Sequence, residues 1–295
     1  MLWQTTRFQI DLVQPQVMGI VNITPDSFSD GGQHASTASA LAHCEQLLHE
    51  GAQMLDIGAE STRPGAQPVP IAQELARLLP VLRAAVTLGV PISVDTYKPQ
   101  VMQAALDVGV DILNDIWALR WADPSHPLAA TDVVVQHPSC GVCLMHMHRE
   151  PQTMQFEPMQ GDAVAQVILF LEQRVQALCA LGIEKNRIVL DPGIGFGKTV
   201  AQNFALLARQ QALLTLGYPL LVGWSRKSSL TGMADVPLGP GDRLIPSVAA
   251  ALLAIERGAR VVRVHDVAAT VQAVKVWIAA DGSGRNFPKS QQALV

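Results

Sequence analysis

Residues 191–199, DPGIGFGKT, place a carboxylate, three glycines and a lysine within nine positions. Glycine-rich stretches that end in Lys-Thr cradle phosphate in nucleotide-binding enzymes, where the loop reads G-x-x-x-x-G-K-[ST]. Here the position five residues before Gly197 is Pro192, and Gly193 comes one residue too late. The motif fails by one residue, so what this stretch binds has to be inferred from the rest of the chain.

Polar residues also close other short runs that are rich in Val, Ile and Leu. In chain order they are Asn22, the loop from Asp56 to Arg63, Asp95, Asn114, His146, Asp191, the loop from Ser225 to Lys227, Arg263 and His265. A single Asp or Asn after a strand is more often a turn or capping residue than a functional one. As a set, however, Asp95, Asn114 and Asp191 opposite a lysine form a pocket for a flat ring with many hydrogen-bond donors.

A repeated unit of helix, glycine and strand predicts how the chain brings these residues together. Six times an apolar helical run ends in glycine and a β-rich run follows at once, at Gly51, Gly89, Gly109, Gly182, Gly217 and Gly258. Glycine suits the left-handed residue that closes a helix, and apolar runs without alternation are typical of strands buried on both faces. Residues 17–22 and 142–147 fit the strand pattern without that glycine.

Eight parallel strands separated by helices, in about 250 residues, predict a single-domain α/β fold of the (β/α)8 TIM-barrel type. A doubly wound sheet is the competing fold, but the G-x-G-x-x-G that usually follows its first strand is absent. We assign residues 1–280 to the barrel domain and 281–295 to a loose C-terminal tail. In a barrel the strand ends meet at one mouth, where we expect the polar residues to face each other.

The composition limits the classes of partner. Hydrophobic residues make up 49% and charged residues 16% of the 295 positions, which is typical of a globular protein with a large core. The net charge of −4 offers no basic surface for nucleic acid. No export signal or membrane span is predicted, and the four cysteines are expected to be reduced thiols of a cytoplasmic protein.

Two further pairs of residues are weak evidence for a metal or redox site. Cys140 and Cys143 are spaced like half of a zinc or redox site, but no second pair accompanies them, and we expect Cys143 to be a structural residue of a buried strand. His146 and His148 are expected to point the same way from a strand, yet no third metal ligand is placed by the sequence.

Eight segments together resemble the dihydropteroate synthase family of pterin-binding TIM barrels. They are VMGIVNITPDSFSDGG (17–32), DIGAESTRPGA (56–66), ISVDTYKP (92–99), DILNDI (111–116), LMHM (144–147), DPGIGFGKT (191–199), GWSRKS (223–228) and RVHD (263–266). The resemblance runs in register from Val17 to Trp277 and implies an enzyme of folate synthesis. Such an enzyme joins a dihydropterin methyl diphosphate to 4-aminobenzoate and releases pyrophosphate, and the family resemblance also suggests a homodimer.

The resemblance implies a role for individual positions. The pterin-binding set is Asp95, Asn114, Ile116, Asp191, Phe196, Gly223 and Lys227. The diphosphate set is Thr62, Arg63, Arg263 and His265, with Mg²⁺ held by Asn22. The 4-aminobenzoate slot is formed by Pro64, Phe196 and Ser225, and the catalytic group is Phe28, Asp30, Arg63 and Lys227. The glycine-rich turn would let the backbone approach closely and present Phe196 to the second substrate.

No nucleophile and base are paired at these positions, and an aromatic amine needs little activation. The resemblance therefore implies that diphosphate leaves first and that the resulting pterin-methyl cation is then captured. Two alternatives stay open: a pterin-binding methyltransferase domain, and a relative that binds pterin without turnover. Two bulky residues near the expected mouth, Trp117 and Trp224, depart from the family pattern, and residues 121–141 match no motif.

Overall fold

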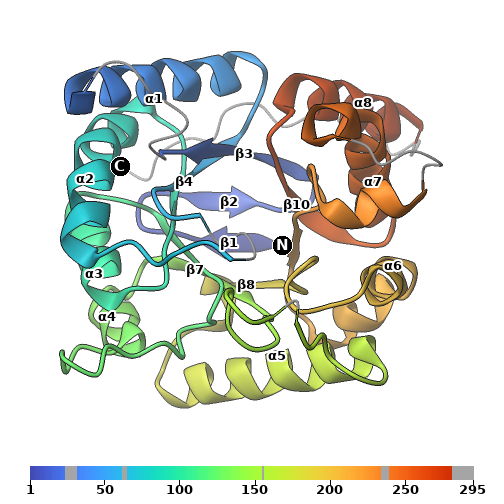
Figure 1. Cartoon of the computed structure of the whole chain (residues 1–295). Coiled ribbons are helices and arrows are strands. Elements are labelled where there is room, and N and C mark those ends of the chain that lie inside the picture. Colours follow the sequence, from blue (N-terminus) through green and yellow to red (C-terminus); the bar gives the residue numbers. More distant parts are fainter. Residues whose placement is uncertain (24–31, 62–64, 155, 234–238, 281–295) are drawn as a thin grey trace.

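The computed structural model describes residues 1–23, 32–61, 65–154, 156–233 and 239–280. Eight parallel strands close into a barrel in the order β10-β3-β4-β5-β6-β7-β8-β9, and helices surround it (Figure 1). The strands are β3 (Gln16–Asn22), β4 (Met54–Gly58), β5 (Ile92–Asp95), β6 (Ile112–Asp115), β7 (Gly141–Met145), β8 (Ile188–Asp191), β9 (Leu220–Val222) and β10 (Ala259–Val264). The predicted (β/α)8 barrel is therefore confirmed.

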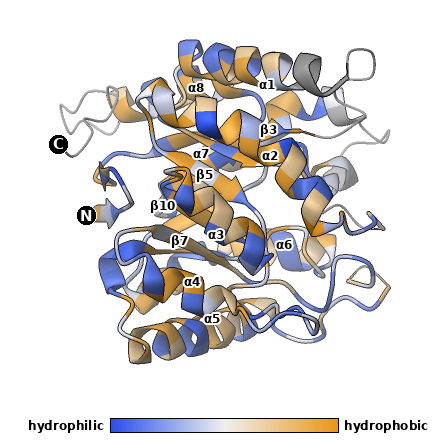
Figure 2. Ribbon diagram, turned by 90° about the vertical axis from the view of Figure 1, so that its left-hand side faces the viewer, coloured by the Kyte–Doolittle hydropathy of each residue, from blue (hydrophilic) through white to orange (hydrophobic). Residues whose placement is uncertain are grey.

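The outer layer consists mainly of α-helices that connect successive strands. They are α1 (Gly32–His49), α2 (Ile71–Ala85), α3 (Pro99–Asp107), α4 (Ala130–Gln136), α5 (Ala163–Ala180), α6 (Val200–Ala208), α7 (Leu244–Glu256) and α8 (Val267–Ala280). All six glycines expected to end helical segments have φ between +74° and +103°, which confirms the predicted left-handed positions. Figure 2 shows helices such as α1 and α5 carrying both hydrophobic and hydrophilic residues, as expected for helices with one face on a core.

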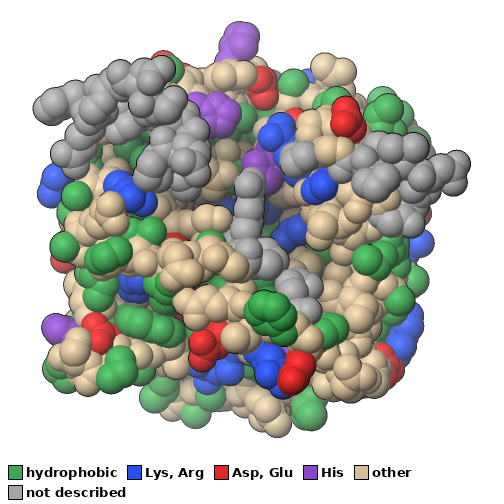
Figure 3. Space-filling view, in the orientation of Figure 1, with side chains coloured by type: hydrophobic (Ala, Val, Ile, Leu, Met, Phe, Trp, Pro, Cys, Tyr) green, Lys and Arg blue, Asp and Glu red, His purple; other side chains and the backbone are tan. Residues whose placement is uncertain are grey.

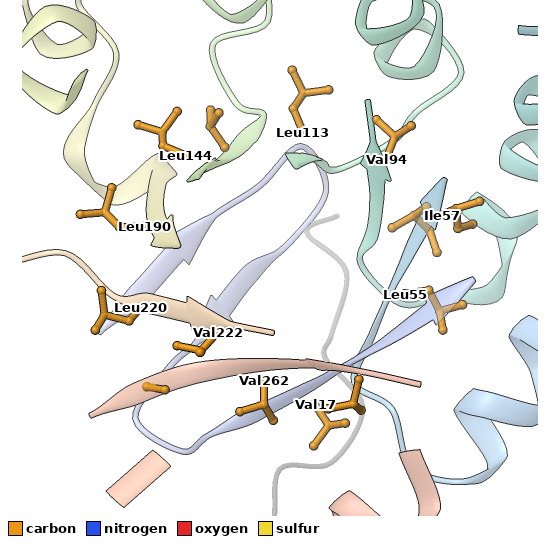
Figure 4. Packing of buried hydrophobic residues seen from close by; sticks show 14 of the residues in the cluster. Val17, Leu55, Ile57, Val94, Leu113, Leu144, Leu190, Leu220, Val222 and Val262 are labelled. Atoms are coloured by element: carbon orange, nitrogen blue, oxygen red, sulfur yellow. The ribbon is translucent and has the colours of Figure 1, made fainter. Parts of the chain in front are cut away.

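Side chains alternate between the two faces of each barrel strand. One set points outward and packs under the helices. Members labelled in Figure 4 are Val17, Leu55, Ile57, Val94, Leu113, Leu144, Leu190, Leu220, Val222 and Val262. The other set points into the barrel. Because the period of a strand is two residues, this alternation fixes which residues can reach the barrel axis.

The amino-terminal end of the barrel interior is filled by apolar side chains, here called the floor layer. Its members are Met18, Met54, Ile112, Cys143, Val189, Leu221 and Val261. An antiparallel hairpin of β1 (Leu2–Gln4) and β2 (Gln9–Asp11) packs against this layer through Trp3, Phe8, Ile10 and Leu12, all fully buried. The indole N–H of Trp3 donates to the carbonyl of Arg187 at 3.0 Å. The hairpin closes one end of the barrel, and β1 and β2 are visible in the middle of the barrel in Figure 1.

Among the residues that the structure describes, one helix, α5, is long enough and apolar enough to span a membrane, judged by length and composition alone. A third of that stretch is buried inside the protein. Its buried face includes Val164, Val167 and Leu171, and the helix contacts β7 and α6. We therefore interpret α5 as a helix of the barrel's outer layer.

Candidate active site

A polar layer lies directly above the floor layer. Two residues after each floor residue, the strand again points a side chain into the barrel. The steps from floor to mouth are Met54 to Asp56, Ile112 to Asn114, Cys143 to Met145, Val189 to Asp191, Leu221 to Gly223 and Val261 to Arg263. We use the name polar layer for Asp56, Asp95, Asn114, Asp191 and Arg263. The expected convergence of Asp95, Asn114 and Asp191 at the barrel mouth follows from this alternation.

Arg263 connects the carboxylates of this layer. Its Nε donates to Asp56 Oδ2 at 2.5 Å and its Nη2 to Asp95 Oδ2 at 2.8 Å. Asn114 Nδ2 donates to the same Oδ2 of Asp56 at 2.9 Å. Arg263, which the resemblance assigns to diphosphate, therefore contacts Asp95, which the resemblance assigns to the pterin ring.

Asp56 is a site residue that the sequence analysis missed, since it appeared only as the start of a strand-end loop. Its side chain is fully buried, and it bonds both Asn114 and Arg263. Its Oδ1 and the hydroxyl of Ser93, its register partner on β5, are buried without a hydrogen-bond partner among the described residues. The inward parity shared by Met54 and Asp56 is the signal that would have identified it.

Burial shifts the ionisation of the charged groups at the mouth. It raises the pKa of Asp95 to about 7, against the opposing attraction of Arg263. It also raises the pKa of Asp191, although the backbone N–H of Gly193 and the ammonium of Lys227 favour the carboxylate. Burial lowers the pKa of Lys227 to about 8. Groups with such shifts in a concave site are typical of binding and catalytic residues.

The glycine-rich turn after β8 wraps around its own lysine. Lys198 Nζ donates to the carbonyls of Gly193 at 2.7 Å, Phe196 at 3.1 Å and His146 at 3.3 Å. Gly193 has φ of +68°, and a Cβ at this position would lie 1.8 Å from the carbonyl oxygen of His146. The lysine thus braces the turn internally, which supports the interpretation that the stretch is not a Walker A loop. The close approach that the glycines allow is to the backbone after β7.

An apolar wall adjoins the polar layer. Its buried members are Tyr97, Ile116, Met145, Met147 and Met154, and Trp117, Trp121 and Phe196 pack against them. Lys227 Nζ lies 4.4 Å from the centre of the Phe196 ring, so two residues predicted to serve the same pocket meet there. Met145 was not predicted, although its inward position two residues after Cys143 would have indicated it.

Ser225 and His265, which the resemblance assigns to different substrates, contact each other. Ser225 Oγ lies 3.0 Å from His265 Nδ1, and the backbone N–H of His265 donates to Ser225 Oγ at 3.1 Å. Gly223, at the inward position before Ser225, has the backbone of Arg263 as its nearest neighbour, 3.9 Å from where a Cβ would lie. The ends of β9 and β10 therefore form one continuous edge of the mouth.

Asn22, the predicted magnesium ligand, is exposed at the carboxyl end of β3, in register with Gly58. Five further predicted residues lie outside the described residues: Phe28, Asp30, Thr62, Arg63 and Pro64. Figure 3 shows Lys, Arg and His side chains gathered around the middle of the mouth. The part of the chain that the structure describes contains no group of three His, Cys, Asp or Glu placed to hold a metal ion.

Two expectations about the mouth are wrong. The His146 ring does not face the mouth; it packs edge-on against Phe170 of α5, with ring centres 4.9 Å apart. Trp224 is buried behind β9 against Phe204 of α6, with ring centres 5.4 Å apart. Both occupy outward positions of the two-residue alternation, which the analysis of strand ends did not apply. Cys143 lies in a buried strand as predicted.

Trp117, by contrast, does lie beside the mouth. It is half-buried and lines a hollow of about 350 Å³ together with Glu60, Tyr97, Arg120 and Trp121. The turn that carries it contains two non-glycine residues with positive φ, Ala118 and Leu119. The carboxylate of Asp115 holds this turn by accepting the N–H groups of Trp117 at 2.8 Å and Leu119 at 2.6 Å.

Known proteins match this chain over most of its length. The sequence profile of the family described as "Pterin binding enzyme" matches residues 18–265. The dihydropteroate synthase of Neisseria meningitidis serogroup B is 48% identical over 284 residues, covering 94% of this chain and 96% of that protein. The crystal structure of Burkholderia cenocepacia dihydropteroate synthase complexed with 7,8-dihydropteroate has a TM-score of 0.84 at 48% identity, covering 96% and 98% of the two chains. The Xanthomonas albilineans dihydropteroate synthase with 4-aminobenzoic acid has a TM-score of 0.84 at 47% identity, covering 94% and 99%.

Proposed function

The chain belongs to the dihydropteroate synthase family of pterin-binding enzymes, and from this premise we propose how its barrel mouth performs the reaction. The reaction condenses (7,8-dihydropterin-6-yl)methyl diphosphate with 4-aminobenzoate to give 7,8-dihydropteroate and pyrophosphate. The relatives favour this activity over the pterin-binding methyltransferase considered from the sequence.

The polar layer is the proposed site of the pterin ring. The observation that carries this assignment is that Asp95, Asn114 and Asp191 converge at the barrel axis with little exposure to solvent. A carboxylate accepts two parallel hydrogen bonds from the 2-amino-pyrimidine edge of a pterin, and an amide supplies both a donor and an acceptor. Lys227 adds a donor for the ring oxygen or nitrogen.

The ring faces are proposed to contact Ile116 and Met145 of the apolar wall, with Phe196 and Gly223 beside them. Ile116 is 5% exposed and Met145 4% exposed, so both form a fixed surface against which a flat ring can pack. Planar ligands gain most of their affinity from such apolar contact, and the few polar groups fix their orientation. The wall thus supports the assignment made for the polar layer.

The diphosphate is proposed to bind where the ends of β3 and β10 meet the loop after β4, through Thr62, Arg63, Arg263 and His265. Asn22 would hold Mg²⁺ there. Its exposed amide oxygen suits this ion, which takes one or two protein oxygens and completes its shell with phosphate and water. When bound, the ion neutralises the charge of the leaving diphosphate. A planar guanidinium such as that of Arg263 matches two phosphate oxygens.

We propose that departure of diphosphate precedes attack by the amine. The C–O bond breaks with its electron pair leaving on pyrophosphate, and the pterin-methyl cation is stabilised by its ring and by the neighbouring carboxylates. The neutral amine of 4-aminobenzoate then forms the C–N bond and loses one proton. Phe28, Asp30, Arg63 and Lys227 remain the proposed catalytic group around this cation.

The second substrate is proposed to bind between Pro64, Phe196 and Ser225. The bond between Ser225 and His265 is in favour of this arrangement, because it fixes the serine at the edge where the diphosphate would leave. The ring of Phe196 lies 4.4 Å from Lys227 Nζ, so this wall of the proposed slot adjoins the residues proposed for the pterin.

A homodimer in the cytoplasm is the proposed form of the enzyme. Large apolar side chains are exposed on two adjacent helices: Leu244, Ile245 and Leu253 of α7, and Val276 of α8. Ile245 is 79% and Val276 70% exposed, which is typical of a surface covered by a partner. Sedimentation analysis of the wild type and of Ile245→Lys tests this: a dimer that the substitution dissociates is expected, whereas a wild-type monomer would contradict it.

Pyrophosphate release by the purified chain tests the proposed activity. Sustained release is expected when the pterin diphosphate, 4-aminobenzoate and Mg²⁺ are all present, and the product should be 7,8-dihydropteroate by mass. Binding of the pterin without release would instead support a relative that does not turn over. A product that does not contain 4-aminobenzoate would contradict the proposed second substrate.

A further inference from the structure

The turn after β6 begins with the residue proposed to face the pterin ring. On β6, Ile112 and Asn114 point into the barrel, and Ile116 continues the same alternation at the mouth. The pairing of β6 ends at Asn114 toward β5 and at Asp115 toward β7. Ile116 thus lies beyond the last paired position of its strand, so the turn that follows has to fix its place.

Asp115 holds this turn. Its side chain is fully buried, and its carboxylate accepts the backbone N–H groups of Trp117 at 2.8 Å and Leu119 at 2.6 Å. Its backbone carbonyl accepts the N–H of Ala118 at 3.1 Å. One residue therefore binds three successive N–H groups, and Ile116 lies inside the small loop that the first of these bonds closes.

The turn has a conformation that its residues do not favour by themselves. Ala118 has φ of +52° and Leu119 has φ of +59°, in the left-handed region that residues with a Cβ rarely occupy. Such a backbone persists only where its surroundings impose it. Here the carboxylate of Asp115 acts from within the turn, and Arg174 of α5 acts from outside, because its Nε donates to the carbonyl of Ala118 at 3.0 Å.

The stability of the fold does not explain a carboxylate at this position. Burial raises the pKa of Asp115 to about 6, against its two backbone hydrogen bonds and the attraction of Arg120 and Arg174. The charged form is therefore disfavoured in the folded protein. Glycine at the two left-handed positions would adopt this turn without steric strain. A role in placing the neighbouring side chain explains the arrangement better.

We propose that Asp115 is a positioning residue for the pterin ring, because its carboxylate fixes the turn that holds Ile116 in the apolar wall. Asp115 itself alternates with Asn114 and points away from the barrel interior. It acts through Ile116, whose neighbours in the wall include Tyr97 and Met145. This inference rests on the proposed function, and it predicts that loss of the Asp115 carboxylate weakens pterin binding only while Ile116 is present.

A double-mutant cycle on the affinity for a dihydropterin without diphosphate, measured by calorimetry, tests this coupling. Ile116→Ala should weaken binding by about tenfold, because it removes part of one face of the pocket. Asp115→Ala should weaken binding by a similar factor. The double variant Asp115→Ala/Ile116→Ala should bind no more weakly than either single variant, since residues that act as a unit have non-additive effects.

Asp111→Ala is the matched control. Asp111 directly precedes β6 at its other end, is also fully buried, and accepts the backbone N–H groups of Arg7 at 3.0 Å and Ile92 at 2.9 Å. Its urea unfolding midpoint should fall as that of Asp115→Ala does, while its pterin affinity stays at the wild-type value. An equal loss of pterin affinity in Asp111→Ala would show that destabilisation alone weakens binding, and would overturn the inference.

Asp115→Asn keeps the test decisive if Asp115→Ala does not fold. The amide retains one acceptor oxygen and places a donor against the second N–H, so its loss of affinity should be smaller than that of Asp115→Ala. This loss should also disappear when Ile116→Ala is present. A further loss in that background, or wild-type affinity in Asp115→Asn and Asp115→Ala alike, would overturn the inference. Failure of the proposed function is separate, since the wild type itself would then not bind the dihydropterin.

Discussion

The floor layer and the polar layer are built by the same strands with the same inward parity, yet their chemistry is opposite. On β8, Val189 packs among apolar side chains and the hairpin closes beneath it, whereas Asp191 two residues later faces the mouth. The barrel thus separates its tasks along its axis. The amino-terminal end of the barrel buries apolar side chains, which stabilise the fold. The carboxyl-terminal end holds charged side chains, whose burial costs stability.

Burial of the charged groups at the mouth lowers the stability of the fold, whereas burial of the floor layer raises it. Burial raises the pKa of Asp95 and of Asp191 and lowers that of Lys227, so each charged form is disfavoured in the folded protein. Val189 of the floor layer and Trp3 of the hairpin that packs against it are fully buried without such a conflict. Substitutions in the two layers should therefore separate stability from ligand binding.

The largest expected effect is on stability, from the hairpin that packs against the floor layer. Trp3→Ala removes a fully buried indole and its bond to the Arg187 carbonyl, and the expected loss in free energy of unfolding is about 3–5 kcal/mol. Urea unfolding measures it. At low temperature, where the variant is folded, its pterin affinity should equal that of the wild type; a weakened affinity there would show that the two layers are not separable.

The next largest effect is on binding, from the polar layer. Asp95→Asn replaces a carboxylate by an amide with less acceptor capacity, and pterin affinity should fall by about 1.5–3 kcal/mol, the value of a hydrogen bond to a charged group. Isothermal calorimetry checks it. The unfolding midpoint should not fall, because the substitution also removes a buried charge. Unchanged affinity would remove Asp95 from the pocket.

A third prediction concerns the coupling between ligands at the mouth. Pyrophosphate with Mg²⁺ should tighten 4-aminobenzoate binding in the presence of a pterin by about 1–3 kcal/mol, and the reciprocal effect should be equal. The ordering of the slot by the first ligand lowers the entropy loss for the second. Titrations of 4-aminobenzoate with and without these ligands measure the difference. Equally tight binding to the free enzyme would show that the slot is preformed.

The smallest effect is a shift in pH dependence. Since the pKa of Lys227 is lowered to about 8, its ammonium is lost as pH rises through that value, and pterin affinity should decline above it by at most about tenfold per pH unit. In Lys227→Arg the guanidinium stays charged, so the decline should move to higher pH. A decline at the same pH in both proteins would assign it to another group.

Local patterns in the sequence were enough to predict the eight strands, the glycine at six helix ends and the polar residues at the strand ends. The two-residue alternation was also available, and it would have excluded His146 and Trp224 from the mouth and included Asp56 and Met145. Each error arose because the residues at a strand end were considered together, without asking which of them point into the barrel and which point outward. The barrel fold could be predicted without any information on side-chain contacts.

Other features depend on contacts between distant positions and had no local signal. The hairpin consists of two three-residue strands, too short for a clear pattern, and its place under the floor layer depends on tertiary packing. The buried ammonium of Lys98 contacts Glu60 and Glu74, and the three residues come from separate parts of the chain. Neither the spacing nor the residue types at these positions indicate that they meet.

The affinity of a dihydropterin for two variants of β8 tests the separation of the layers most directly. Calorimetry on Asp191→Asn should show affinity weakened by about 1.5–3 kcal/mol, whereas Val189→Ala, two residues earlier on the same strand, should bind like the wild type. Equal loss of affinity in both variants, or a loss confined to Val189→Ala, would contradict the account.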